Sequence, residues 1–311
     1  MNTTTIFCID GGGTKTRGRV YGRDGAVLAE AVAGPCNVSS DPALAAANVA
    51  AVWRACAAQI GQDAAAPEQV KAVIAAAGTL PAATRDVFLR QIPPFGALSL
   101  EMDGHAALIG AGGGQPCALI IAGTGAVAHR LYPGGRSIRR DGWGWIGGDR
   151  GSGVWLGRKA LRHAVAVYDG ITPPTILARR ILRQLAAQGG IAETFAGIRP
   201  YQIAAYAPLV IDCALEGDAF AQGLLSTAAD HFERLAGLLD LTDGVPLYIA
   251  GGLAGVLGPH LAQRLGRPVA IPAADALYGC YLIAIGAATS EDASFSTYPD
   301  EEALNGNDQA R

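Results

Sequence analysis

Asp10-Gly11-Gly12-Gly13-Thr14, a glycine-rich turn near the start of the chain, has a shorter counterpart in Gly123-Thr124-Gly125. Each turn stands between two segments that both carry a β-strand pattern. In a Rossmann unit or a P-loop, by contrast, the glycine loop leads into a helix that holds the phosphate. A phosphate-sized loop at the bend of a β-hairpin, present twice, therefore predicts two similar lobes that close on a nucleotide.

A third strand extends each hairpin. Asp24-Gly25 favours a two-residue turn, which predicts that residues 16–21 and 26–32 pair with each other. The second copy has the same plan, with strands predicted over 118–122, 126–131 and 136–140. We therefore predict an α/β fold in which each lobe is a mixed sheet with an N-terminal triplet of hairpin strands and flanking helices.

Helical and strand patterns alternate through the rest of the chain, and Asp41 is a good N-cap for the first long helix. In the first lobe, we predict helices over 42–60, 81–91 and 104–110 and strands over 4–9, 70–76 and 98–102. In the second lobe, we predict helices over 154–168, 175–190, 201–216, 218–240, 253–265 and 274–289, strands over 245–250 and 268–272, and a loop over 143–153.

These elements divide the chain into three parts. We expect an N-terminal lobe over residues 1–112 and a C-terminal lobe over 113–289, whose last helix can pack back on the first lobe. From residue 290 onward acidic side chains outnumber basic ones, so residues 290–311 are predicted to be an acidic disordered tail.

Composition excludes several classes of protein. A net charge of −3 gives no reason to expect nucleic acid or an anionic membrane as a partner. The N-terminus has no signal-peptide pattern, and we expect no apolar stretch long enough to span a membrane. The six cysteines form no C-x-x-C pair and the five histidines have no metal-ligand spacing, so we predict a cytoplasmic protein with reduced thiols and without a transition metal.

The glycine-rich segments have the composition of a nucleotide site. Bare backbone lets N–H groups approach phosphate oxygens, a hydroxyl or a lysine adds to the cradle, and Asp10 could hold Mg²⁺ through water. A tight turn without a ligand is the alternative. Gly251-Gly252, after an apolar strand, could lie against adenine or simply serve packing. The residues assigned to the nucleotide are Gly11, Gly12, Gly13, Thr14, Lys15, Gly123, Thr124, Gly251 and Gly252.

Three polar residues are candidates for the second substrate. Asp103 ends an apolar strand, where open α/β sheets place their ligands, and it could either accept a proton or cap the following helix. Asp149 lies in a glycine-rich loop after two tryptophans, a composition that suits a sugar, but it could also be a turn residue. Asn37 could bind a hydroxyl or hold its own turn.

In their order along the chain, these motifs resemble the BadF/BadG/BcrA/BcrD-type ATPase family, which belongs to the sugar kinase, heat-shock chaperone and actin superfamily. Within it the sequence looks most like the N-acetylglucosamine kinase and bacterial glucosamine kinase branch. The resemblance spans about residues 5–289. The motifs that carry it are Asp10–Thr16, Asp103, Ala122–Gly125, Gly142–Gly144, Gly148–Gly153 and Ala250–Gly252.

The resemblance implies a two-lobed actin-like, ribonuclease H-like fold and an ATP- and Mg²⁺-dependent kinase that acts on the 6-hydroxyl of N-acetylglucosamine or glucosamine. By it, Asp103 matches the catalytic base, and the amino-sugar contacts are Asn37, Thr124, Gly125 and Asp149. Two departures border the sugar pocket, because Arg150 stands where glutamate is usual and Ala126 where serine is common. We also expect a homodimer.

Two other functions are compatible with this fold. An ATP-driven activator of an acyl-CoA dehydratase or reductase would carry an iron–sulfur cluster, which needs thiolate ligands near the nucleotide, and the loops 123–125 and 142–153 contain no cysteine. A non-catalytic sugar-sensing regulator would keep the two lobes that bind the nucleotide but lose the catalytic base, whereas Asp103 is present here.

Overall fold

The computed structural model describes residues 5–61, 66–78, 82–242 and 244–289. Its first sheet has the strand order β3-β2-β1-β4-β5, in which β1 is antiparallel to β2 and parallel to β4. The five strands are β1 (Thr5–Gly11), β2 (Thr16–Tyr21), β3 (Val27–Ala33), β4 (Val70–Ala76) and β5 (Ala97–Met102). The predicted hairpin triplet and the two strands that follow it are confirmed. The predicted two-residue Asp24-Gly25 turn is wrong: β2 and β3 are joined by a longer turn, in which the Gly25 N–H donates to the Gly22 carbonyl at 3.1 Å and only Gly25 has a positive φ.

The second sheet repeats this plan with one strand fewer. Its order is β8-β7-β6-β9, and β6 is antiparallel to β7 and parallel to β9. Its strands are β6 (Cys117–Ala122), β7 (Ala126–Leu131), β8 (Ser137–Asp141) and β9 (Leu247–Ala250). Because both glycine-rich turns connect the first two strands of a triplet, the two turns occupy equivalent positions, at the C-terminal end of β1 in the first sheet and of β6 in the second.

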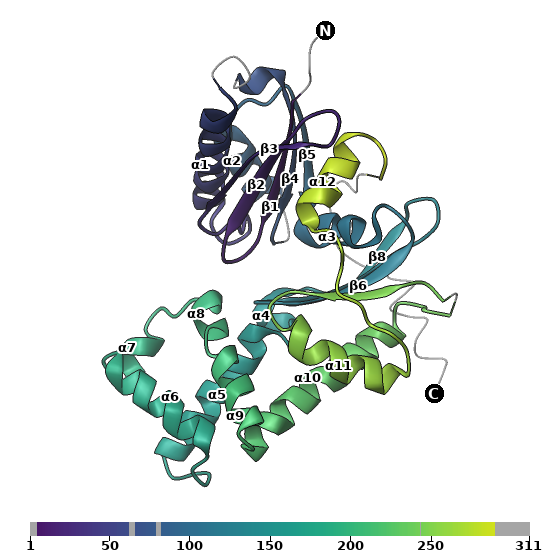
Figure 1. Ribbon diagram of the computed structural model, residues 1–311. Helices are drawn as coiled ribbons and strands as arrows, with labels where there is room; N and C mark the ends of the chain where they lie inside the picture. Colours follow the sequence, from purple (N-terminus) through teal and green to yellow (C-terminus); the bar gives the residue numbers. More distant parts are fainter. Residues whose placement is uncertain (1–4, 62–65, 79–81, 243, 290–311) are drawn as a thin grey trace.

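Helices form layers around the two sheets (Figure 1). Helices α1 (Pro42–Ile60) and α2 (Ala82–Gln91) cover one face of the first sheet, and Asp41 caps α1 as predicted by accepting from the Leu44 N–H at 2.9 Å. Helices α3 (Asp103–Gly112) and α12 (Ala276–Ala284) lie between the two sheets and share a buried core with both.

The outer face of the second sheet is covered by a larger group of helices, which bury the most extensive apolar core of the described residues. Two predictions for this part of the chain differ from the structure. The single-turn helix α4 (Gly144–Gly147) lies inside the expected loop, and the expected helix over 201–216 is split in two. The group consists of α5 (Gly153–Tyr168), α6 (Ile176–Ala187), α7 (Ile191–Phe195), α8 (Pro200–Ala204), α9 (Ala207–Leu215), α10 (Ala219–Gly237) and α11 (Ala254–Leu265).

The split has a local cause, because Pro208 stands in the first turn of α9 and lacks the N–H that a continuous helix would need there. The strand predicted over 268–272 is also wrong, since only an isolated bridge joins Ala270 to Tyr248. The predicted last helix is shorter than expected and ends before Gly286, which has φ of 75°.

Helix α12 packs against α3, β1 and β4, so the chain returns to the first lobe after completing the second. Glycines permit this crossing. A Cβ atom on Gly279 would stand 1.9 Å from the Ala106 carbonyl oxygen, and one on Gly110 would stand 2.1 Å from that of Asp275. The division of the chain at residues 112 and 113 stays a prediction, and the predicted acidic tail lies outside the described residues.

One helix is longer and more apolar than the sequence analysis allowed. Of the described helices, α1, with 19 residues and a mean hydropathy of 1.3, is long and apolar enough to cross a membrane by length and composition. Our expectation of no such stretch was therefore wrong. The buried residues of α1, among them Val49 and Val52, belong to the core on one face of the first sheet, a place that also favours an apolar helix.

Candidate active site between the lobes

The first glycine-rich turn is held in shape by its own backbone. Gly12 donates to the Lys15 carbonyl at 2.9 Å, and its carbonyl accepts from the Cys36 N–H at 2.9 Å. Gly11 is required by packing, because a Cβ atom there would come within 2.7 Å of the Cys36 side chain. At Gly13 a Cβ atom would meet nothing within 4 Å, so no contact with the described chain requires glycine at this position.

The second turn is joined to the start of helix α5. The carbonyls of Gly123 and Thr124 accept from the N–H groups of Gly153 and Val154 at 2.8 and 3.0 Å, and Gly123 donates to Gly125 at 3.0 Å. These bonds place the turn beside the N-terminal end of a 16-residue helix. The partial positive charge of such an end favours a nearby anion.

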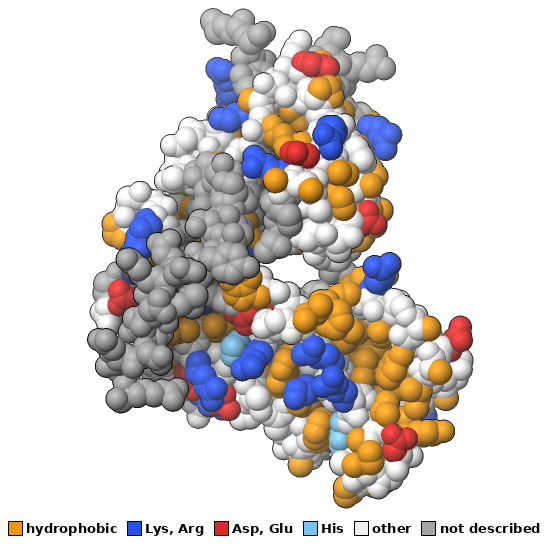
Figure 2. All heavy atoms as spheres, turned by 180° about the vertical axis from the view of Figure 1, so that it is seen from behind, with side chains coloured by type: hydrophobic (Ala, Val, Ile, Leu, Met, Phe, Trp, Pro, Cys, Tyr) orange, Lys and Arg blue, Asp and Glu red, His pale blue; other side chains and the backbone are white. Residues whose placement is uncertain are grey.

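The two turns meet across the space between the lobes. The hydroxyl oxygens of Thr14 and Thr124 lie 3.2 Å apart, although the residues are separated by 110 positions in the sequence. Thr14 is exposed and Thr124 is half-buried. Seen from behind, the space-filling view shows an opening between the two lobes (Figure 2). The two predicted phosphate loops thus face each other, and the Thr124 hydroxyl points at the first loop.

Asp103 lies where β5 passes into α3, and it is the first residue of the helix instead of its N-cap. Its Oδ1 accepts from the Gly104 N–H at 2.8 Å. Burial raises the pKa of Asp103 to about 6, and repulsion from Asp10 adds to the rise, against the Gly104 N–H and the charge of Arg139. A carboxylate of this kind is a stronger base than an ordinary aspartate.

Contact with the second lobe fixes the start of this helix. A Cβ atom on Gly104 would lie 2.2 Å from Nε2 of His129 on β7, so only glycine allows this approach. The Arg139 side chain, from β8, also reaches towards β5, with Nη1 4.0 Å from Sδ of Met102. Asp103 therefore stands at the junction of the lobes.

Asp10, the predicted magnesium ligand, is paired with an arginine on the neighbouring strand. Arg17 donates to Oδ2 of Asp10 from Nη2 at 2.6 Å and from Nε at 3.2 Å, and its Nη1 reaches Asp275 at 3.1 Å. Asp275 in turn caps helix α12. Among the described residues, no group of three or more His, Cys, Asp or Glu side chains could hold a metal by itself.

Asp149 adjoins the second turn. Its Oδ1 accepts from the Ala126 N–H at 3.1 Å, and a Cβ atom on Gly125 would stand 2.9 Å from its Oδ2, so a larger residue at 125 would displace this carboxylate. The side chain is 8% exposed. Burial raises the pKa of Asp149 to about 6 against the Ala126 N–H, and the nearby Asp141 carboxylate contributes to the rise.

Asn37 follows the first lobe's loop and pairs with Ala77 in a single parallel bridge. Its Oδ1 accepts from the Ser40 N–H at 3.0 Å, so this oxygen holds its own turn, as one of the two interpretations predicted. Its contact with a sugar stays a prediction. Trp143 and Trp145, in contrast, are exposed, with 57% and 36% of their surfaces accessible.

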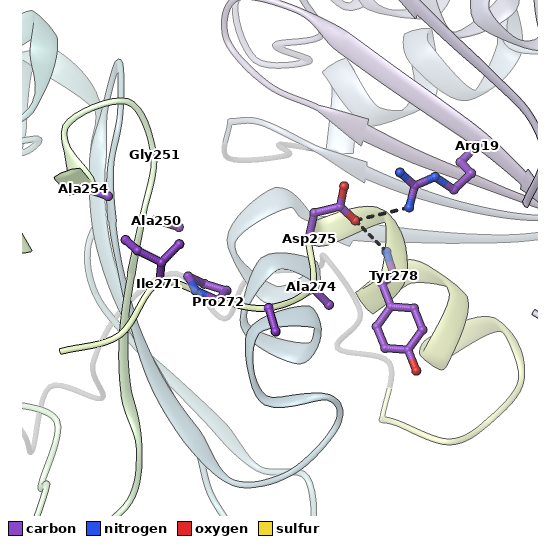
Figure 3. A pocket seen from close by; sticks show the side chains of 10 residues that line it. Arg19, Ala250, Gly251, Ala254, Ile271, Pro272, Ala274, Asp275 and Tyr278 are labelled. Atoms are coloured by element: carbon purple, nitrogen blue, oxygen red, sulfur yellow. Dashed lines mark hydrogen bonds and ion pairs between the residues drawn. The ribbon is translucent and has the colours of Figure 1, made fainter. Parts of the chain in front are cut away.

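A pocket of about 540 Å³ lies between the predicted adenosine segment and the start of helix α12 (Figure 3). One wall is apolar and comes from the second lobe and the connection to α12. The other is polar and includes Arg19, which contacts Asp275 at 3.6 Å. The lining residues are Arg19, Ala250, Gly251, Ala254, Ile271, Pro272, Ala273, Ala274, Asp275 and Tyr278.

The two glycines of this segment differ in their surroundings. Gly251 has φ of 95°, and a Cβ atom there would lie 2.4 Å from the Ala122 carbonyl oxygen, which brings the segment against the second turn. A Cβ atom on Gly252 would meet nothing within 4 Å. Gly251 thus serves the fold, whereas nothing in the described chain requires glycine at 252.

Several residues of this site were not predicted from the sequence. Arg17 and Asp275 are 258 positions apart, and Asp141 and His231, whose Oδ2 and Nε2 lie 3.0 Å apart, are separated by 90. Arg139 stacks on the Trp143 ring with its guanidinium carbon 4.6 Å from the centroid. The alternation of β2, which puts Arg17 and Arg19 on one face, was the only available signal for any of them.

Residues 8–258 match the sequence pattern of the BadF/BadG/BcrA/BcrD ATPase family. The chain belongs to this family. A glucosamine kinase of Vibrio cholerae, GspK, is 26% identical over 277 residues, which are 89% of this chain and 94% of the relative. An N-acetylmuramic acid/N-acetylglucosamine kinase of Clostridium acetobutylicum is 28% identical over 232 residues, which are 72% of this chain and 75% of the relative.

The crystal structure of a protein from Chromobacterium violaceum that is provisionally named N-acetylglucosamine kinase superposes on this chain with a TM-score of 0.83. The two sequences are 33% identical, and the match covers 91% of this chain and 100% of that one. The predicted family and the two-lobed actin-like ATPase fold are therefore confirmed.

Proposed function

We propose that this protein is an ATP-dependent kinase that transfers the γ-phosphoryl group to the 6-hydroxyl of N-acetylglucosamine or glucosamine. One observation carries the proposal. Two glycine-rich turns from different lobes meet at Thr14 and Thr124, and a carboxylate with a raised pKa, Asp103, stands at the same junction. The names of the amino-sugar kinases among the relatives support the class of acceptor.

The open space at certain glycines supports the nucleotide site. A Cβ atom added at Gly13 or Gly252 would meet nothing within 4 Å, and one added at Gly12 would meet only the Lys15 carbonyl at 3.5 Å. Backbone without side chains is what a close-bound phosphate or adenine needs. We assign the polyphosphate to the two turns, with Lys15 contributing charge, and the adenosine to the pocket beside Gly251.

The residues present fit a Mg²⁺ ion that accompanies ATP. Magnesium keeps several waters and takes one or two carboxylates together with substrate phosphates, so a single aspartate at the end of β1 suffices. Asp10 would hold it through water, because Arg17 engages only its Oδ2. When bound, the ion neutralises charge on the β- and γ-phosphates.

Asp103 acts as the general base. With a pKa of about 6 it is mostly ionised at pH 7, and it accepts the proton of the sugar hydroxyl as the oxygen attacks. The new bond joins O6 to the γ-phosphorus, and the bond from that phosphorus to ADP breaks. Thr124, Gly125, Asp149 and Asn37 are the proposed sugar contacts. Closure of the lobes excludes water, which would otherwise compete as acceptor.

A coupled assay of ADP release tests this function. The panel consists of N-acetylglucosamine, glucosamine, N-acetylmannosamine, glucose and buffer alone. We expect turnover with one of the first two sugars to exceed that with buffer by at least about 10², with the phosphorus coupled to the two C6 protons in the product's NMR spectrum. Equal ADP release in all five reactions would refute the kinase proposal.

The cysteines weigh against the iron–sulfur alternative. All six are buried and free, and burial raises the pKa of the Cys36 thiol, the one nearest to the first turn, to about 12. A cluster shared between two subunits would need accessible thiolates. The free thiols also suit a reducing compartment, which supports the proposed cytoplasmic location. The homodimer stays a prediction.

A further inference from the structure

The loop that precedes Asp149 is closed by a single carboxylate at its base. Oδ1 of Asp141 accepts from the Gly142 N–H at 2.8 Å and from the Asp149 N–H at 3.0 Å. Asp141 ends β8, and Asp149 stands eight positions later, after α4 and the two exposed tryptophans. One oxygen thus joins the start of this loop to its end.

The carboxylate itself is fixed from a third direction. Nε2 of His231, on α10, lies 3.0 Å from Oδ2 of Asp141, and the two side chains are only 19% and 8% exposed. Although burial opposes ionisation, the hydrogen bond from His231 and the two backbone N–H groups hold the pKa of Asp141 below its ordinary value. The acceptor therefore stays charged and oriented at neutral pH.

The backbone at both ends of the loop adopts a conformation that needs such support. Asp141 has φ of 62° and Asp149 has φ of 57°, which is costly for residues other than glycine and is tolerated best by Asp and Asn. Gly148 provides the space for the Asp141 carboxylate, which with its bonds to the N–H groups of Gly142 and Asp149 we call the clamp, because a Cβ atom on Gly148 would lie 2.1 Å from Oδ1 of Asp141. Strained backbone of this kind is common at functional sites.

We propose that Asp141 is a positioning residue that holds Asp149 for the sugar. It acts through the backbone of Asp149, whose own carboxylate is then free to bond Ala126 on one side and a sugar hydroxyl on the other. His231 keeps the Asp141 carboxylate in place. The inference rests on the proposed function, because Asp149 is a sugar contact only in a sugar kinase.

Two matched pairs of variants test the clamp. Asp141→Gly suits the positive φ but removes the acceptor, whereas Asp141→Asn keeps Oδ1 for the two backbone N–H groups and places its amide nitrogen beside His231. Gly148→Ala directs a methyl group at the carboxylate, whereas at Gly147 the nearest atom to a Cβ would be 3.9 Å away, so Gly147→Ala is its control. For each variant we would measure kcat, the KM for the amino sugar and for ATP, and the melting temperature.

Asp141→Gly and Gly148→Ala should raise the sugar KM about tenfold and leave the ATP KM within about twofold. Loss of the bond from the Asp149 N–H to Asp141 displaces the Asp149 carboxylate, which then loses its hydrogen bond to the sugar. Asp141→Asn and Gly147→Ala should match the wild type. If Asp141→Gly does not fold, the comparison of Gly148→Ala with Gly147→Ala still tests the proposal. A wild-type sugar KM in Gly148→Ala, or an equal rise in both KM values, would overturn the clamp. Absence of sugar turnover in the wild type would instead refute the proposed function.

Discussion

The hydroxyl groups of Thr14 and Thr124 lie within hydrogen-bonding distance, 3.2 Å, and thereby connect two turns that belong to different sheets. Either hydroxyl can be the donor, so each also keeps acceptor capacity for a further partner. The two glycine-rich turns are therefore in direct contact through these side chains. A polyphosphate bound beside this pair would be contacted by both lobes at once.

The hydroxyl of Thr124 should matter for ATP more than for the sugar. Thr124→Ala removes the hydroxyl that faces the first turn, and we expect the KM for ATP to rise about tenfold, the loss of one hydrogen bond to a charged group. Thr124→Ser keeps the hydroxyl and should stay within about threefold of the wild type. Steady-state kinetics with ATP and sugar varied separately would measure both. Thr124 is also a proposed sugar contact, so a rise confined to the sugar KM would remove it from the nucleotide site and leave it with the sugar alone.

Two adjacent glycines should respond differently to alanine. Gly251→Ala places a Cβ atom 2.4 Å from the Ala122 carbonyl at a φ of 95°, so we expect the melting temperature to fall by several degrees. Gly252→Ala meets open space and should leave that temperature unchanged, yet raise the KM for ATP because the methyl group enters the adenosine position. Thermal unfolding without nucleotide, followed by ATP kinetics, separates the two. An unchanged ATP KM in Gly252→Ala would show that adenosine does not bind beside Gly252.

The pKa of Asp103 predicts an acid limb of activity. A carboxyl group with a raised pKa keeps its proton to higher pH, so the base is lost as the pH falls through about 6 and not through about 4. At saturating sugar, kcat should be level above pH 7 and fall about tenfold per unit below pH 6. Because Asp149 has a similar pKa, Asp149→Asn is the control, and it should keep the limb in kcat. A level profile down to pH 4.5 would exclude Asp103 as the base.

Magnesium dependence should distinguish the two aspartates that Arg17 contacts. Asp10→Asn removes the proposed outer ligand, so more Mg²⁺ should be needed for half-maximal activity, by about tenfold. Asp275 contacts the same arginine, and Asp275→Asn is the control because asparagine is also a good helix cap. The Mg²⁺ requirement of this variant should match that of the wild type. Titration of Mg²⁺ at fixed free ATP measures this. Equal shifts in both variants would trace the effect to Arg17 and not to the ion.

Local patterns predicted most of the fold. The alternating residues of β2 and β7 specify hairpins by themselves, although Asp24-Gly25 did not specify the length of its turn. Asp41 with the following proline specifies the start of α1. These signals lie within a few residues of the structure that they produce. The break between α8 and α9 was missed because the helical pattern of 201–216 continues through Pro208, and α4 because a single turn has too few residues to show a period.

The candidate site could be predicted only in part for a related reason. The sequence marks the glycine turns and Asp103, because backbone requirements and strand ends leave local signals. It does not mark the pairing of Arg17 with Asp275 or of Asp141 with His231, since each depends on how distant elements pack. Asn37 differs, because its side-chain Oδ1 accepts from the Ser40 N–H only three residues away, a local turn that the sequence offered as one of two interpretations.

The turnover of Asp103→Asn tests the central claim most directly. Asparagine preserves the shape and the bond from the Gly104 N–H but cannot accept the proton of the sugar hydroxyl. We expect kcat to fall by about 10²–10⁴, while sugar affinity measured by calorimetry changes less than about threefold. The melting temperature at pH 7.5 should not be lowered, because ionising this half-buried carboxyl group, whose pKa is raised to about 6, costs stability above that pH. Near-normal kcat in this variant would contradict the account.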